Sequence, residues 1–229
     1  MDILNRISNF AGDIFGINLN KSQELQSAPP LPLGPGGASD GSGLGQAQQI
    51  QSDINPGVRA TLNTISKAEG TWDESAQAPD YTMRFADAPG EGSLDVTKPH
   101  PLDVRGSRYG SGYRSNASGA YQFMGGGAAP TWEEMNDGLN AVMSPSMQDQ
   151  AAEKLIRQRT DYDFDEPFDG QSHELASQWA SIGDRSGKSA YGQPTKDSDM
   201  LNAFYNDQYS KLDQLRRDDI YQQLMLRQR

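Results

Sequence analysis

Glu69 is the residue whose type and position best suit proton-transfer chemistry. It stands between a stretch with helical apolar spacing and Gly70, which puts its carboxyl group at the C-terminal end of a helix, where a core meets irregular chain. Partial burial would raise the pKa of such a carboxyl group, as would the negative end of the helix dipole. A general acid near neutral pH needs that shift. A Glu before a Gly is also the pattern of an ordinary exposed helix end, so spacing alone does not select Glu69.

Other polar clusters carry weaker signals. The acidic residues of 161–169 begin with the spacing of a calcium-binding loop, but Glu166 stands where that loop needs Gly and Ser172 where it needs Glu. We interpret this cluster as a solvated acidic loop. His100 and His173 have no second ligand at metal spacing. We therefore expect neither a metal ion nor a cofactor.

The element that must position Glu69 is a helix with clear start and stop signals. Asp53 or Asn55 can cap its beginning, Pro56 suits the first helical position, and Gly70 can end it. Between these signals one apolar face recurs at helical steps, through Val58, Leu62 and Ile65.

The segment after this helix is rich in Gly, Pro and Asp and has little helical periodicity. Residues 71–120 are predicted to be irregular, with short strands around Tyr81–Phe85 and, just beyond, Ala120–Met124. Trp72 is close to Glu69 in sequence. It could line a cleft or form the pocket that raises the pKa of Glu69.

Helical signals return in the second half of the chain. A capping box at Thr131–Glu134 and a Ser-Pro start at Ser144 each predict a helix. Apolar spacing predicts two more helices, one at 175–180 and one from Met200 to Leu212. The second helix would begin after Thr195 or Asp197, and the basic tail after Arg216 would extend it. Trp132 and Trp179 stand among helical apolar positions and are expected in the core.

The N-terminus is predicted to be separate from the folded domain. Residues 1–20 include a short amphipathic helix with apolar residues at steps of three and four. This helix could lie on the protein's own domain or dock on another protein. Residues 21–52 are too rich in Pro, Gly, Ser and Gln to bury a core, so we expect a linker or extended arm.

Composition and charge exclude several classes of partner. The 229 residues carry a formal net charge of −11 and contain no cysteine, so disulfides and thiolate chemistry are excluded, and binding to nucleic acid through its phosphates is disfavoured. No apolar run approaches the roughly 20 residues that span a membrane, so we expect no integral membrane segment.

Six short motifs in order resemble the lambda-phage type of endolysin, a family of lysozyme-fold lytic transglycosylases. The resemblance extends from about Ile65 to Leu212. The motifs are Ala68-Glu69-Gly70-Thr71, His100-Pro101, Gly119-Ala120-Tyr121-Gln122, Ser144-Pro145-Ser146-Met147-Gln148-Asp149, Trp179-Ala180-Ser181 and Tyr191-Gly192-Gln193.

The resemblance implies an α+β, lysozyme-like fold, mostly helical, with a small β region and an extended N-terminal arm. It implies that Glu69 is the single catalytic carboxyl group and that the substrate is the glycan strand of peptidoglycan. The candidate sugar contacts are Gln122, Tyr191, Gln193 and Tyr81, together with Tyr121, which either lines the cleft or packs beneath it. The family has an Asp beside a Tyr in its β region, whereas Tyr81-Thr82 stands here, and Ala120 replaces an Arg.

The number of carboxylates would decide the reaction. Glycosidases that hydrolyse their substrate use two, about 5–5.5 Å apart when retaining and about 6.5–9.5 Å when inverting. A lytic transglycosylase of the family uses one and closes a 1,6-anhydro ring on N-acetylmuramic acid. Asp73 and Glu74 are close enough in sequence to supply a second carboxylate; otherwise they are solvated loop charges.

We thus predict four segments: an anchoring helix at 1–20, a linker at 21–52, a catalytic domain at 53–215 and a C-terminal helical tail at 216–229. The arm suits a virion-associated enzyme that is tethered to other virion proteins and acts in the host periplasm during entry. The alternatives are a free endolysin, held in the host cytoplasm before lysis, and a structural virion protein with a lysozyme fold and little activity.

Overall fold

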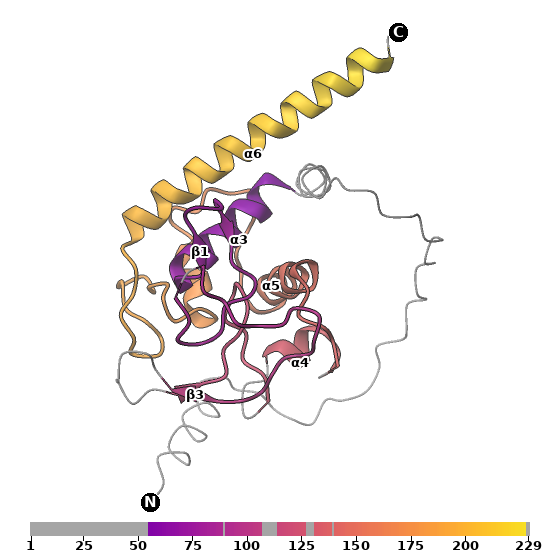
Figure 1. Cartoon of the computed structure of the whole chain (residues 1–229). Helices are drawn as coiled ribbons and strands as arrows, with labels where there is room; N and C mark the ends of the chain where they lie inside the picture. Colours follow the sequence, from indigo (N-terminus) through magenta and orange to yellow (C-terminus); the bar gives the residue numbers. More distant parts are fainter. Residues whose placement is uncertain (1–54, 89, 107–113, 127–130, 139, 228–229) are drawn as a thin grey trace, which may run out of the picture. The chain divides into compact units, whose positions relative to one another are not determined.

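The computed structural model describes residues 55–88, 90–106, 114–126, 131–138 and 140–227. The helix predicted at 1–20 and the linker predicted at 21–52 lie outside these residues. Within them the chain combines helices, two small antiparallel sheets and long irregular segments (Figure 1). The expected mixture of helices and a small β region is present, but helices make up less than half of the described residues.

The helix that ends at Glu69 forms as its sequence predicts. It is α3 (Pro56–Glu69), and the side chain of Asn55 caps it by accepting a hydrogen bond from the Gly57 N–H at 2.8 Å. Gly70 ends it in the left-handed conformation, with φ of +76°, which glycine adopts without steric cost.

Helix α3 is almost wholly buried and organises the core. It packs against α5 (Pro145–Arg159) and along α6 (Ser198–Arg227). Ile65 and Leu62 are fully buried on it, and burial of each such side chain stabilises the fold by about 1.5–3 kcal/mol. Trp132 and Trp179 are buried as predicted.

The caps predicted for the later helices are mostly present. Ser144 caps α5 by accepting from the Met147 N–H, and Asp197 caps α6 by accepting from the Met200 N–H at 2.8 Å. Helix α6 continues through the basic tail to Arg227. The short helix α4 (Thr131–Met135) forms, but the Thr131 hydroxyl bonds Met124 rather than closing a capping box.

The β region differs from the prediction. Its strands are β1 (Trp72–Asp73) with β2 (Ala78–Pro79), and β3 (Arg105–Gly106) with β4 (Arg114–Ser115). Residues 81–85 and 120–124 form only isolated bridges, at Arg84 and Phe123. The reason is local: Asp80 closes a turn onto Thr82, and positive φ angles turn the chain sharply between 119 and 122.

The helix predicted at 175–180 is also shorter than expected. A six-residue 3₁₀ helix, η1 (Ser172–Ser177), stands in its place, and Trp179 follows it in a turn. The Trp179 indole donates to the Tyr121 carbonyl at 3.1 Å, which fixes this turn against residues 119–122.

Candidate functional site

The C-terminal end of α3 places the Glu69 carboxyl group against residues that lie far from it in the sequence. The Ser181 hydroxyl donates a hydrogen bond of 2.5 Å to Glu69 Oε1. Ser181 lies in the turn that follows η1, and its carbonyl accepts from the Lys196 N–H at 2.8 Å. Three chain segments therefore meet at this carboxyl group.

Glu69 is partly buried, and burial raises the pKa of its carboxyl group above the ordinary value of 4.5. Hydrogen bonds from the Ser181 hydroxyl and backbone, and the positive charge of Lys196, offset part of this rise in pKa. Desolvation is the largest cause, so the proton is held more tightly than on an exposed Glu. Such a carboxyl group can donate a proton and take it back.

Sequence reasoning did not assign Ser181 or Lys196 to the site. Ser181 belongs to the Trp179-Ala180-Ser181 motif, so a signal for it was present in the sequence. Nothing in the sequence around Lys196 marks it, because its relation to Glu69 arises only from folding.

A tight turn at 118–123 lies next to the end of α3. Ser118 and Phe123 exchange two backbone hydrogen bonds, of 2.9 and 3.0 Å. The Thr71 hydroxyl donates to the Ala120 carbonyl at 2.5 Å, which joins the turn to the residues directly after Glu69.

Gln148 secures the same turn from α5. Its Oε1 accepts from the Ala120 N–H at 2.8 Å, and its Nε2 donates to the carbonyls of Tyr81 and Met143. A Cβ atom on Gly119 would stand 2.2 Å from Gln148 Oε1. Only glycine fits at 119, so the Gly119–Gln122 motif has a packing reason as well as any role in binding.

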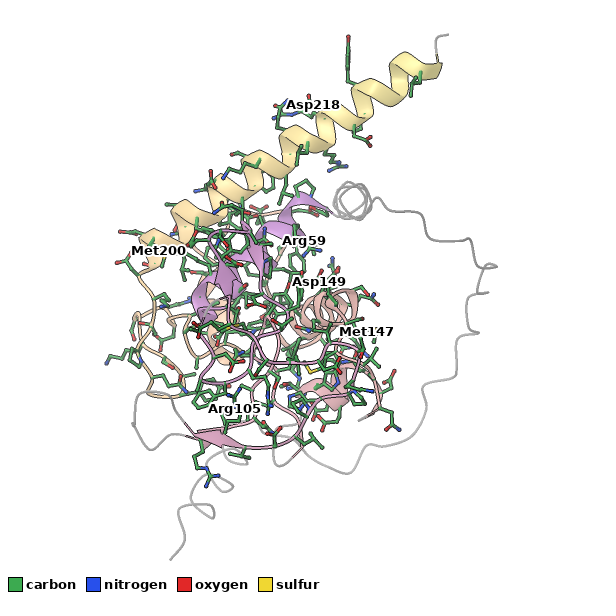
Figure 2. The ribbon with its side chains drawn as sticks, viewed as in Figure 1. Arg59, Arg105, Met147, Asp149, Met200 and Asp218 are labelled. Atoms are coloured by element: carbon green, nitrogen blue, oxygen red, sulfur yellow. The ribbon has the colours of Figure 1, made fainter. Side chains whose placement is uncertain are left out.

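Asp149 connects α3, the β region and the turn through a second buried cluster. It forms an ion pair of 2.7 Å with Arg59, and it accepts hydrogen bonds from the hydroxyls of Tyr81 at 2.8 Å and Tyr121 at 2.5 Å. Figure 2 shows Arg59 on α3 and Asp149 on α5. Burial, the largest cause, raises the pKa of Tyr81 to about 12, so both phenols stay protonated.

This arrangement fixes the positions of two of the predicted sugar contacts. Tyr121 is only 1% exposed, so of its two expected positions it takes the one beneath the surface. The Tyr81 hydroxyl donates a hydrogen bond to Asp149 and accepts one from Arg59. Both side chains are held in the frame of the fold because Asp149 offers them a buried charged acceptor.

Trp72, three residues after Glu69, is buried. Its ring packs edge-on against Phe204 of α6, with 5.0 Å between the centroids. It therefore does not line an open surface, contrary to one of its two expected positions.

The remaining predicted contacts are accessible. Gln122 is partly buried, has φ of +50°, and its amide donates to the Gly119 carbonyl at 3.0 Å. Tyr191 is 53% exposed, and its hydroxyl donates a hydrogen bond of 2.5 Å to the Ser177 carbonyl. Gln193 is exposed. Tyr191 is thus anchored on the segment that leads to Ser181.

The two nearby acidic residues are engaged in their own loop. Asp73 Oδ1 accepts from the backbone and hydroxyl of Ser75 and from the Ala76 N–H. Glu74 forms an ion pair with Lys67. The pKa of Asp73 is lowered, chiefly by the hydrogen bond from the Ser75 hydroxyl, and the pKa of Glu74 is lowered, chiefly by the hydrogen bond from the Lys67 ammonium. Both carboxyl groups are therefore ionised at pH values at which Glu69 still holds its proton.

A hollow of about 920 Å³ lies beside the Glu69 group. It is lined by segments within 169–173, 182–187 and 195–202, and Glu69 is not among the lining residues. Lys196 belongs to the lining and also acts on the Glu69 carboxyl group. The two features are therefore neighbours.

In the part of the chain that the structure describes, no group of three or more His, Asp or Glu side chains is placed to hold a metal ion. Asp165 instead accepts from the Asn55 side chain, and Asp169 accepts from Asn202. These two residues of the acidic loop link it to the ends of α3 and α6. Across the same residues, no helix has the length and apolar character to cross a membrane.

Comparison with known proteins gives one finding. Residues 59–212 match the family model described as Endolysin. No curated protein and no solved structure matches the chain. The matched residues contain Glu69, Ser181 and Lys196, and they end within α6.

Proposed function

Because the chain belongs to the endolysin family, the phage enzymes that degrade the bacterial cell wall, we propose that it is a lysozyme-like lytic transglycosylase with Glu69 as its acid/base. The observation that carries this proposal is the Glu69 carboxyl group itself. It is partly buried at the end of α3, held by Ser181, and its pKa is raised by that burial.

The reaction would take place between N-acetylmuramic acid and N-acetylglucosamine. Protonated Glu69 donates its proton to the glycosidic oxygen as the bond from that oxygen to C1 of the muramic acid breaks. The carboxylate then removes the proton from the 6-hydroxyl of the same sugar, whose oxygen bonds to C1 and closes the 1,6-anhydro ring. Glu69 ends protonated, and no water is consumed.

A single carboxylate suffices for this reaction because the nucleophile and the electrophile belong to one sugar, so little entropy is lost in bringing them together. The structure supports this choice through Asp73 and Glu74: Asp73 Oδ1 accepts from Ser75 and Ala76, and Glu74 Oε1 pairs with Lys67. Both carboxylates are thus held within their own loop.

Three accessible side chains are the candidates for holding the glycan. Gln122 and Gln193 can donate and accept hydrogen bonds to acetamido and hydroxyl groups. Tyr191 is exposed and can pack its ring against a sugar. Tyr121 and Tyr81 act by holding the turn that carries Gln122.

The test of the reaction is mass spectrometry of fragments released from purified Gram-negative peptidoglycan, with the Glu69→Gln variant alongside. We expect anhydro-muropeptides from the parent and none from the variant. Fragments with reducing ends would contradict the transglycosylase and indicate hydrolysis. An absence of fragments from a folded parent would favour a structural virion protein.

We further propose that the enzyme is virion-associated and tethered to other virion proteins through residues 1–52. The support is the amphipathic pattern at 1–20 followed by a segment too polar to bury a core. Phage assembled with a chain that lacks residues 2–52 should lose the enzyme from purified particles, while the shortened protein still cleaves purified peptidoglycan. Unchanged retention of the shortened chain in particles would contradict tethering through residues 1–52, and absence of the full chain from particles would favour a free endolysin.

A further inference from the structure

The hollow beside Glu69 carries charges that cleavage of a bare glycan does not require. Its volume of about 920 Å³ lies within the roughly 300–1,000 Å³ of typical ligand sites. It opens next to Ser181, since Ile182 belongs to its lining. A substrate group attached close to the bond at Glu69 could therefore extend into it.

The end of the hollow near Glu69 carries a positive charge. Among the described residues Lys196 forms no ion pair, and its charge acts on the Glu69 carboxyl group. Its backbone is fixed by the hydrogen bond to the Ser181 carbonyl. The ammonium group is thus available to a carboxylate that arrives with the substrate.

Elsewhere the lining carries Arg185, which bonds His173 and pairs with Glu174, and four aspartates. Two of its four aspartates are satisfied within the protein, since Asp184 accepts from Ser186 and Lys188 and Asp197 caps α6. Among the described residues Asp169 accepts one hydrogen bond, from Asn202, and Asp199 is exposed. Neither Asp169 nor Asp199 is among the charges that act on Glu69. The lining therefore offers a cation, unpaired within the described part of the chain, that acts on Glu69, and two carboxylates that do not.

We propose that this hollow binds the peptide stem of peptidoglycan, an inference that rests on the proposed function. The stem is attached to the lactyl group of N-acetylmuramic acid, the sugar whose bond is cleaved. Its first residues carry a carboxylate, and the diamino acid at its third position in Gram-negative walls carries an ammonium group. Lys196 binds the carboxylate, and Asp169 and Asp199 bind the ammonium group.

The activity test compares intact glycan strands with strands from which an amidase has removed the stems. The parent should have a kcat/KM about tenfold higher on intact strands, chiefly through KM. Lys196→Gln and Asp199→Asn should each lower kcat/KM on intact strands by about three- to tenfold, with a smaller effect on stripped strands. Lys188→Gln is the matched control, because Lys188 is exposed in the same region and does not line the hollow.

The two variants also separate stem binding from an effect on Glu69. Loss of the Lys196 charge changes the pKa of Glu69 on both substrates, whereas Asp199 has no such influence. A parent with equal kcat/KM on both substrates would overturn the proposal. So would an Asp199→Asn variant that matches the parent on intact strands.

A binding measurement keeps the proposal independent of catalysis. The free stem tripeptide, which ends in the diamino acid, is titrated into the full-length Glu69→Gln variant, and backbone amide shifts are followed by NMR. We expect saturable shifts at Gly183, Gly187 and Asn202, reduced in the Lys196→Gln background. If the parent cleaves neither substrate, the proposed reaction fails. The titration then decides the stem site by itself, and unchanged spectra would overturn it.

Discussion

At neutral pH the partial burial of Glu69 opposes folding, because the folded protein holds the proton more tightly than the unfolded chain does. Its folded pKa is raised above 4.5, so the free energy of unfolding decreases as pH rises from about 4.5 through the folded pKa. Glu69→Gln should therefore stabilise the protein near pH 7, by about 0.5–2 kcal/mol, and abolish cleavage. Thermal unfolding at neutral pH and near pH 4 checks this; a gain that persists unchanged in acid would contradict it.

Ser181 acts on Glu69 through the hydrogen bond to Oε1. This bond stabilises the carboxylate, so its loss in Ser181→Ala should raise the pKa of Glu69 further. The alkaline limb of the pH–rate profile, where a general acid loses its proton, should then move to higher pH. Ser177→Ala is the control, because the Ser177 side chain is exposed and does not contact Glu69. An unmoved alkaline limb would show that another group sets it.

His100, in the β region, has a pKa that is shifted in the opposite direction to that of Glu69. Burial lowers the pKa of its imidazole below 6.5. Its neutral form donates from Nε2 to the Phe123 carbonyl at 2.9 Å, and Nδ1 accepts from the Leu102 N–H at 3.2 Å. This imidazole therefore fixes one end of the turn that carries Gln122.

Protonation of His100 should weaken the fold in mild acid. Because the unfolded chain takes up the proton first, the stabilising contribution of neutral His100 is complete above about pH 6.5 and is lost as pH decreases toward the folded pKa. Urea unfolding of the parent and of His100→Gln at several pH values measures the difference, which should be on the order of 1 kcal/mol. His173→Gln is the control, and the same pH dependence in all three proteins would refute the assignment.

Among the elements, α3 and α5 depend on each other through Arg59 and Asp149. Removal of one partner leaves a buried charge without its counterpart, so Arg59→Ala and Asp149→Ala should each cost about 3–5 kcal/mol. The Asp149→Ala change should lower the free energy of unfolding more, since Tyr81 and Tyr121 also lose their acceptor. In a double-mutant cycle, the paired change should cost about 1–3 kcal/mol less than the two single costs added together. Strict additivity would mean that the ion pair does not couple the helices.

At the scale of the whole molecule, the final part of α6 contributes little to the core. Leu201 and Tyr205 are buried, but Leu215, Ile220 and Leu226 are exposed, and Figure 2 shows Asp218 on this outer part. Removal of residues 216–229 should therefore change the free energy of unfolding by less than about 1 kcal/mol. A truncation after Lys211, which also removes Leu212, serves as the positive control, because Leu212 packs against the core. Equal losses in both truncations would contradict this division of the helix.

The sequence by itself determined the features that depend on local chemistry. The Asn55 cap, the Gly70 stop and the Ser144-Pro145 start follow from residues within one turn of each helix end. The position of Glu69 at the end of its helix follows in the same way. These predictions succeeded because capping and apolar periodicity act over only a few neighbouring residues.

Only the tertiary structure decided which distant groups meet. Ser181 reaches Glu69 across 112 residues of chain, and Asp149 binds the hydroxyls of the partly buried Tyr81 and the buried Tyr121. The strands predicted at 81–85 and 120–124 became turns because backbone and side-chain hydrogen bonds there competed with strand pairing. Burial and long-range hydrogen bonds set the protonation of Glu69, and no local pattern contains them.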